Sequence, residues 1–158
     1  MNRQEILELL KERKISYEMT EHEAIFNMEE AGHDKMPYPD AEAKTLFLRD
    51  DKKRNWYLVT VRGNRKLDLK WFQSEFETRR LSFASDADLM KYMHLIPGAV
   101  TPFGLLNDET SSVQFFLDRT FVHQMIGIHP NDNTASVWMN ADDLVSIIKE
   151  HGNPVQIF

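Results

Sequence analysis

Short apolar runs alternate with capped amphipathic segments along the whole of this sequence, and this alternation limits the folds open to it. Residues 45–48 and 56–61 are apolar runs of strand length, and a charged segment typical of a hairpin connection joins them. Other segments carry apolar residues at helical spacing, as 144–148 do after Asn140, a residue type that caps helices. This mixture predicts an α/β or α+β fold.

The individual patterns predict about eight strands and four or five helices. Helices are expected to begin at Asn2, Asn27, Ser85 and Asn140, and the last of them to end at Gly152. A further helix is expected where Leu69, Phe72 and Phe76 stand at helical spacing. Residues 32–40 and 97–104 are predicted to be loops because proline and glycine interrupt them. The strands are expected at 15–19, 45–48, 56–61, 81–84, 113–117, 125–128, 134–139 and 155–158. So many strands among irregularly spaced helices predict a mixed, strongly curved sheet with helices around it, rather than a doubly wound sheet.

Length and composition indicate a globular protein. The 158 residues fit one domain, 1–158, and 42% of them are hydrophobic. There is no cysteine, which excludes disulfides, thiol chemistry and a Cys-ligated zinc. The six histidines are scattered without helical ligand spacing, so we expect no metal and no cofactor.

The charge pattern restricts the kinds of partner. The N-terminal segment has no apolar signal core and no run approaches bilayer length, so we expect a cytoplasmic protein without a membrane partner. The net charge of −6 disfavours extensive binding to a nucleic-acid backbone. Recognition of one RNA end by a pocket and a small basic patch remains open.

Three segments are candidates for chemistry, and each also has a structural interpretation. Lys44 is either a solvated lysine at a strand edge or a fixed positive charge at the mouth of a pocket. Residues 97–104, with two glycines and two prolines, form either a rigid connection or a loop whose N–H groups approach a ligand closely. His129 is either structural or a polar group of a pocket wall.

A run of basic residues is the fourth candidate. This run holds nearly all the positive charge of the middle of the chain. It forms either a solvated face or a patch that binds RNA phosphates. Its members are Lys52, Lys53, Arg54, Arg62, Arg65, Lys66 and Lys70. Standard signatures of hydrolases and nucleotide-binding proteins, such as GxSxG, HExxH and the P-loop, are missing from the sequence.

Taken together, these segments resemble the prolyl-tRNA editing-domain family (YbaK/ProX type). Residues 44–48 look like the family's lysine-led strand, 97–105 like its glycine-proline loop, and 127–136 like its histidine-proline segment. Glu21 and His22, followed by Ala24 and Phe26, match its early loop. The matches come in the family's order and span nearly the whole chain.

The resemblance implies a fold, an activity and a set of site residues. The implied fold is a mixed sheet curled into a partial barrel, and the implied activity is trans-editing deacylation of mischarged proline tRNA, with Ala-tRNA(Pro) as the expected substrate. Lys44, Gly98 and His129 would be the catalytic residues. The tRNA acceptor end would meet Lys52, Lys53, Arg54, Arg62, Arg65 and Lys66, and substrate-binding residues would be Thr45, Ala99, Val100, Thr101, Pro102, Phe103, Asn133 and Ser136.

Such a deacylase needs few groups of its own. The aminoacyl ester is activated by the neighbouring ribose hydroxyl, so the protein has to place a water and stabilise an oxyanion. Prolyl-tRNA synthetase is a further expected partner, and a monomer or weak dimer is the expected state.

Two departures from the family pattern leave alternatives open. Thr45 stands where the family often has Asn, and Ser136 stands where it has Thr. A Cys- or Ser-specific deacylase and a non-catalytic module that binds the tRNA end are the alternatives within this fold. A small-molecule hydrolase on an unrelated α/β fold is the third, but it should carry a nucleophile or metal motif.

Overall fold

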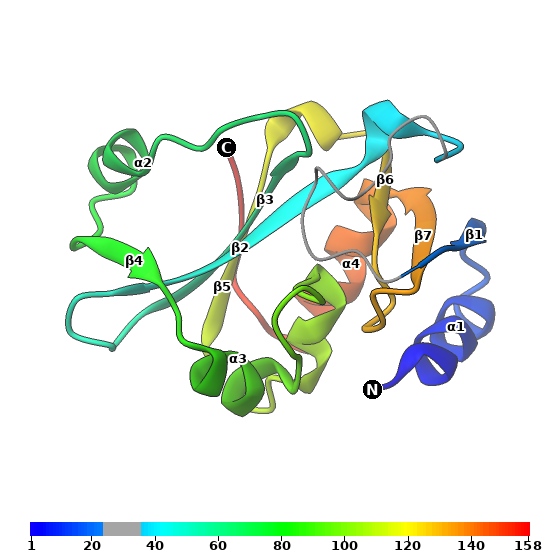
Figure 1. The fold of residues 1–158 in the computed structure, drawn as a ribbon, viewed down its shortest axis with the longest axis horizontal. Helices are drawn as coiled ribbons and strands as arrows, with labels where there is room; N and C mark the ends of the chain where they lie inside the picture. The colour runs from blue at the N-terminus through cyan, green and yellow to red at the C-terminus, as the bar shows by residue number, and fades with distance from the viewer. Residues whose placement is uncertain (24–35) are drawn as a thin grey trace.

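The strands form two neighbouring sheets (Figure 1). The structure, a computed structural model, describes residues 1–23 and 36–158. The larger sheet has the order β4-β2-β3-β5-β8, made of β4 (Leu81–Phe83), β2 (Ala43–Asp50), β3 (Trp56–Arg62), β5 (Val113–Leu117) and β8 (Val155–Ile157). The smaller sheet has the order β1-β7-β6, made of β1 (Tyr17–Glu21), β7 (Ala135–Asn140) and β6 (Met125–Ile128).

The larger sheet is mixed. β2 pairs with β3 and β4 antiparallel, whereas β3 pairs with β5 and β5 with β8 in parallel. A parallel bridge between Glu42 and Gly127 joins the two sheets at the start of β2. The prediction of a mixed α/β fold is confirmed. In the described part of the chain the strands divide into two bridged sheets and form no closed barrel.

The helices begin where polar caps satisfy their first N–H groups. Capping boxes pair Asn2 with Glu5 and Ser85 with Asp88, as the sequence predicts, and Gly152 ends the last helix in a left-handed conformation (φ 110°). The helices are α1 (Arg3–Glu12), α2 (Leu69–Glu75), α3 (Asp86–Met93) and α4 (Ala141–His151). Short 3₁₀ turns are η2 (Pro39–Ala41), η3 (Pro102–Asn107) and η4 (Arg119–Phe121).

Two further comparisons with the predicted elements concern loops and a helix. The predicted loop 97–104 ends early, because Pro102 begins η3 with a backbone angle preset for a helical turn. Likewise, η2 lies at the end of the predicted loop 32–40. The predicted helix start at Asn27 lies outside the described residues.

Apolar side chains pack on both faces of the larger sheet, and β2 contributes to both. Ala43 and Phe47 belong to the main core, with α1, α3 and α4, whereas Leu46 and Leu48 belong to a second core under α2. Because neighbouring side chains of a strand point to opposite faces, Thr45 faces the main-core side and Lys44 the α2 side.

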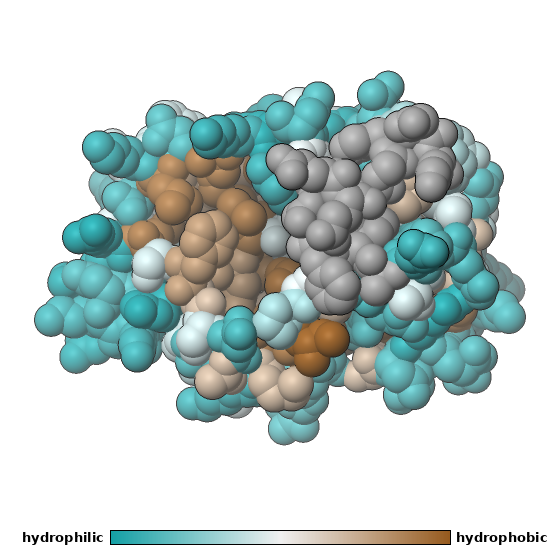
Figure 2. Space-filling model, in the orientation of Figure 1, coloured by the Kyte–Doolittle hydropathy of each residue, from teal (hydrophilic) through white to brown (hydrophobic). Residues whose placement is uncertain are grey.

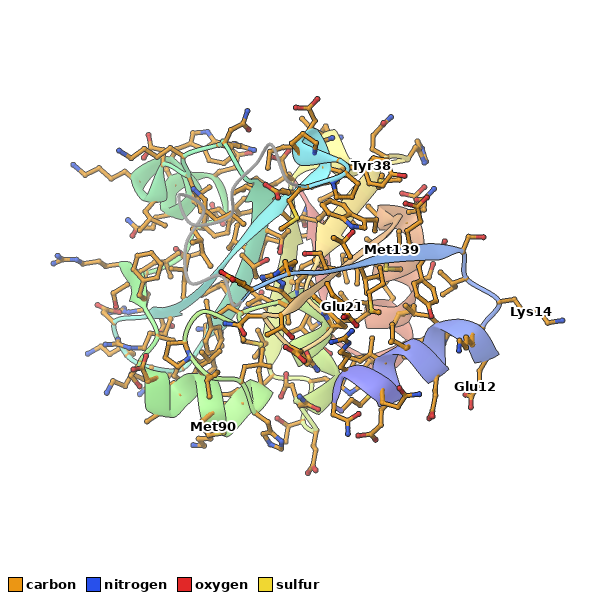
Figure 3. All side chains as sticks on the ribbon, turned by 45° about the vertical axis from the view of Figure 1, so that its right-hand side comes forward. Glu12, Lys14, Glu21, Tyr38, Met90 and Met139 are labelled. Atoms are coloured by element: carbon orange, nitrogen blue, oxygen red, sulfur yellow. The ribbon has the colours of Figure 1, made fainter. Side chains whose placement is uncertain are left out.

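The outer surface is largely polar, with some apolar side chains. Figure 2 shows apolar surface gathered between α2 and α3, and Phe83 and Ile96 are more than half exposed. Figure 3 shows Met90 pointing outward from α3, and Glu12 and Lys14 pointing outward beyond the end of α1. None of the helices described has the length and apolar character needed to cross a membrane.

Candidate functional site

A cavity lies at the seam where the two sheets meet. It holds about 450 Å³ of space not filled by atoms, including its open mouth. Its lining comes from the start of β2, from the segment before η3, and from β6, β7 and the turn after β6. The lining residues are Met36, Glu42, Ala43, Thr45, Val100, Thr101, Pro102, Gly127, Ile128, His129 and Ser136.

One wall of the cavity is main chain because Gly127 has no side chain. A Cβ atom at Gly127 would lie 2.2 Å from Cζ3 of Trp138, far inside van der Waals contact. Trp138 is buried, and its indole N–H donates to the Thr20 hydroxyl at 3.0 Å. The tryptophan ring therefore fills the volume that a larger residue at 127 would need.

A pair of hydrogen-bonded threonine hydroxyls lies on the β2 side of the cavity. Thr45 Oγ1 and Thr60 Oγ1, opposite each other on β2 and β3, are 3.0 Å apart. Thr60 is fully buried, and within the described residues its hydroxyl bonds to Thr45 alone. Since a buried hydroxyl proton needs an acceptor, Thr60 donates and Thr45 accepts. The proton of the Thr45 hydroxyl is then not used by Thr60, and Thr45 belongs to the lining of the cavity.

The opposite side holds a serine that is bonded to a histidine. His22 Nδ1 donates to the carbonyl of Glu23 at 2.8 Å. His22 Nε2 and the Ser136 hydroxyl form a hydrogen bond at 3.0 Å. Ser136 is buried and lines the cavity.

His129 is also held by hydrogen bonds to the main chain. Its Nδ1 donates to the carbonyl of Ala135 at 2.9 Å, and its own carbonyl accepts the Thr101 hydroxyl at 2.6 Å. Burial lowers the pKa of His129 and outweighs the hydrogen bond to Ala135, which acts to raise it. The neutral ring thus keeps an unprotonated Nε2, and the rings of His129 and His22 meet edge to face at 5.9 Å.

Glu42 brings a carboxylate to the same lining and is 7% exposed. In the described ranges, no group of three or more His, Asp or Glu side chains is placed to hold a metal ion. The lining therefore combines hydroxyls, an imidazole and a carboxyl-bearing residue.

The structure brings six of the predicted site residues into the lining: Thr45, Val100, Thr101, Pro102, His129 and Ser136. Five others lie outside it: Lys44, Gly98, Ala99, Phe103 and Asn133. Ala99 and Phe103 are buried side chains behind the wall, and Gly98 adopts a left-handed turn (φ 86°) two residues before the lining begins.

Lys44 is the predicted residue whose place differs most from the expectation. Its ammonium donates to the carbonyl of Arg65 at 2.6 Å, on the α2 side of the sheet. Burial, followed by the nearby charge of Lys66, lowers the pKa of Lys44. Contact between Lys44 and a substrate stays a prediction.

The basic residues do not form one patch. Lys52, Lys53 and Arg54 lie at the tip of the β2–β3 hairpin, whereas Arg62, Arg65 and Lys66 lie at or just past the other end of β3. Seven strand residues separate the two groups, which is about 20 Å.

Two of these arginines bind the protein itself. The Arg62 guanidinium donates to the carbonyl and hydroxyl of Thr120 and to the carbonyl of Asp40, and it lies 4.2 Å from the centre of the Phe121 ring. The Arg65 guanidinium donates to the carboxylate of Asp118 at 2.9 Å. Contact between the basic residues and tRNA stays a prediction, and Arg62 and Arg65 already have partners inside the protein.

Several residues of the site did not stand out in the sequence. Met36, Glu42, Ala43, Gly127 and Ile128 line the cavity, and Thr60 and His22 orient its hydroxyls. Cross-strand pairing and the bridge between the sheets bring these residues together. The position of Gly127 and Ile128 directly before His129 was the one local signal, and His22 entered through the family resemblance alone.

Comparisons with known proteins agree with this arrangement. Residues 22–147 match the family model of the aminoacyl-tRNA editing domain. The prolyl-tRNA editing protein ProX of Acetoanaerobium sticklandii is 41% identical over 152 residues, 96% of this chain and 93% of that protein. The prolyl-tRNA synthetase associated domain-containing protein 1 of Bos taurus is 30% identical, over 88% of this chain and 84% of that protein.

A solved structure shows the same fold. The crystal structure of a candidate trans-editing enzyme for prolyl tRNA synthetase superimposes with a TM-score of 0.72, covering 98% of this chain and 94% of the other at 18% identity.

Proposed function

This chain belongs to the aminoacyl-tRNA editing domain family, and from that premise we propose that it is a trans-editing hydrolase of mischarged proline tRNA, with Ala-tRNA(Pro) as its substrate. The observation that carries the proposal is the cavity at the seam of the sheets, together with a relative of matching length that is named for prolyl-tRNA editing. tRNA is thus the proposed partner, with prolyl-tRNA synthetase as a further one. The cytoplasm is the proposed location, and a monomer or weak dimer the proposed state.

The lining supplies what hydrolysis of an aminoacyl ester needs. The ester is activated by the adjacent ribose hydroxyl, so a positioned water and a donor for the developing oxyanion suffice. We assign the donor to the Thr45 hydroxyl, which belongs to the lining and lies beside the buried hydroxyl of Thr60. Main-chain groups of Val100 and Thr101 replace Gly98 in this role, because these two residues reach the lining and Gly98 does not.

Lys44 has a proposed role that the geometry makes testable. It adjoins Thr45 on β2, and its ammonium links β2 to the chain just beyond β3. Deacylation is expected to be lost in Lys44→Ala. If the role is only to hold Arg65 in place, Lys44→Arg should restore activity together with the fold, whereas equal activity of Lys44→Ala and the wild type would remove Lys44 from the mechanism.

One experiment tests the activity and its specificity. The pure protein is mixed with proline tRNA charged with labelled alanine, cysteine, serine or proline, and the loss of label is followed with time. Alanine is expected to be released fastest and proline to be retained. Preferential release of cysteine or serine would change the assigned substrate, and tRNA binding without release of any label would leave a non-catalytic binding module.

The buffer control in that assay is the same set of charged tRNAs without protein. A second control is Thr110→Val, which removes an exposed hydroxyl far along the chain from β2 and outside the cavity. This variant is expected to keep the wild-type rate, since its hydroxyl bonds only to other polar groups of the loop before β5.

A further inference from the structure

We propose that two copies of this chain associate through the free edge of the larger sheet, where β4 of one copy pairs antiparallel with β4 of the other around a two-fold axis at Phe83. β4 is the outermost strand of that sheet, beside β2. Figure 1 shows β4 at the end of the molecule away from β6 and β7, which contribute to the cavity. The proposal concerns a surface other than the cavity and does not depend on the proposed function.

The main chain of Phe83 is directed away from the sheet. Phe83 lies opposite Leu48 where β4 pairs with β2. The next N–H along the chain, that of Ala84, donates to the carbonyl of Phe47 at 2.9 Å. In an antiparallel ladder the residues of a strand bond alternately to one side and to the other. Since Ala84 bonds toward β2, the N–H and the carbonyl of Phe83 point to the open edge.

The edge is covered two residues before Phe83 and is open at Phe83 itself. The N–H of Leu81 also points outward, and it donates to the side-chain oxygen of Gln73 on α2 at 2.8 Å. No side chain in the described part of the chain bonds to the main chain of Phe83, whose ring is 62% exposed. An edge residue with free main-chain groups and an exposed apolar side chain is a template for pairing with another strand.

Two charged residues of opposite sign stand at equal distances along the chain from Phe83. Arg80 precedes it by three residues and Asp86 follows it by three, and both are exposed. Neither forms an ion pair with any residue that the structure describes, whereas the neighbouring Arg79 binds Asp51 at 2.5 Å. Residues equally far from the axis meet in an antiparallel pair. Arg80 of each copy therefore lies opposite Asp86 of the other, which gives two ion pairs.

The remaining cross-strand neighbours also fit a second copy. Phe83 lies opposite Phe83, with both rings on the same face of the joined sheet, where they shield each other from water. Ser82 lies opposite Ala84. Leu81 lies opposite Ser85, so no like charges meet. A two-fold interface needs one self-complementary patch, which this stretch supplies. Each cross-strand pair changes an association constant by up to about fivefold, so this short strand predicts a weak dimer.

The first test measures molecular mass by sedimentation equilibrium from micromolar to millimolar concentrations. The wild type is expected to change from monomer to dimer, and Phe83→Glu, which places a charge on the axis, is expected to stay a monomer. Met19→Glu is the matched control, because Met19 is also an exposed apolar residue on an edge strand, β1 of the smaller sheet. This control should dimerise like the wild type. A wild type that stays monomeric throughout, or a dimer that persists in Phe83→Glu, would overturn the proposal.

The second test concerns the ion pairs. Arg80→Glu and Asp86→Arg each place like charges opposite one another in a dimer of identical copies, and each is expected to raise the dissociation constant about 10-fold or more. Mixed in equal amounts, the two variants restore opposite charges at both positions. A heterodimer is therefore expected at concentrations at which either variant alone is a monomer. Because only folded chains can pair in this way, recovery also shows that neither variant has lost its structure. No recovery on mixing would overturn the antiparallel pairing at Phe83.

Discussion

The cavity at the seam of the sheets and the basic segment 52–66 both contain site residues that were predicted from the sequence. They differ in how far their polar groups are already hydrogen-bonded within the protein. In the cavity, hydroxyls and imidazoles of the lining bond to one another and to a main-chain carbonyl, and they keep capacity for further hydrogen bonds. In the basic segment, the guanidiniums of Arg62 and Arg65 donate hydrogen bonds to oxygen atoms of the protein itself. The difference shows that a site is defined by the hydrogen-bonding capacity left over after folding, rather than by the number of charges.

The largest expected effect concerns the donor of the cavity. Thr45→Val keeps the shape of the side chain and removes the hydroxyl, so single-turnover deacylation of Ala-tRNA(Pro) is expected to fall by about 10²–10³, as when an oxyanion donor is removed. The same change deprives the buried Thr60 hydroxyl of its acceptor. Thr60→Val is therefore the control, since it removes the same pair but leaves the Thr45 donor in the cavity. If both variants lose the same activity, the pair matters for structure and not for catalysis.

The next effect concerns stability in the basic segment. Arg65→Met leaves the buried carboxylate of Asp118 without its guanidinium and is expected to lower the free energy of unfolding by about 1.5–3 kcal/mol, measured by urea denaturation. Lys66→Met, next along the chain, should stay within about 0.5 kcal/mol of the wild type. Equal stability of the two variants would mean that Arg65 is available for RNA after all.

The ion pair between Arg65 and Asp118 should also make the stability of the protein depend on pH in the acidic range. Burial acts to raise the pKa of Asp118, but hydrogen bonds from Thr120 and Arg65 outweigh it, so the folded-state pKa is lowered from 3.8. A lowered carboxyl pKa stabilises the fold above the unfolded value and loses that contribution as the pH falls through the folded value. Unfolding midpoints measured between pH 6 and pH 2 should therefore decline below about pH 4.

The matched variant in this titration is Asp118→Asn. It is expected to be less stable at pH 7 and to show a shallower acid decline. The decline should persist in part, because Asp132 and Asp50 also have lowered pKa values. If the unfolding midpoints of the variant and the wild type decline in the same way with falling pH, the acid sensitivity belongs to other carboxylates.

The smallest effect is expected at the hairpin tip. Replacing Lys52 and Lys53 together by Glu should change stability by less than about 0.5 kcal/mol, because the tip is exposed and makes few contacts. KM for charged tRNA is expected to stay within about twofold at physiological salt, where exposed charges are screened beyond about 8 Å. A large rise in KM would place the RNA at the tip and make this end of the basic segment a binding surface.

Local features of the fold were predictable from the sequence, and non-local ones were not. The caps at Asn2 and Ser85 depend on residues three positions apart, and both were predicted correctly. The sides of β2 were harder to assign, because 43–48 are half-buried or buried on both faces and the period-two pattern disappears. The sequence therefore drew attention to Lys44, although Thr45 faces the cavity.

Long-range contacts explain the remaining differences. The partner of Arg62, Thr120, is 58 residues away, and that of Ser136, His22, is 114 residues away. No spacing rule predicts such pairs. The resemblance to a family supplied the approximate location of the site, while the direction of each proton in it required the coordinates.

The glycine wall has a consequence for how this cavity changes. Trp138 occupies the volume beside Gly127, so that side of the cavity cannot be reshaped by single replacements without displacing a buried indole. Altered substrate preference, whether it arises in nature or by engineering, is then expected to come from other side chains of the lining, such as Ala43, Val100 and Ile128. Libraries aimed at new specificities should diversify those three positions and leave 127 and 138 untouched.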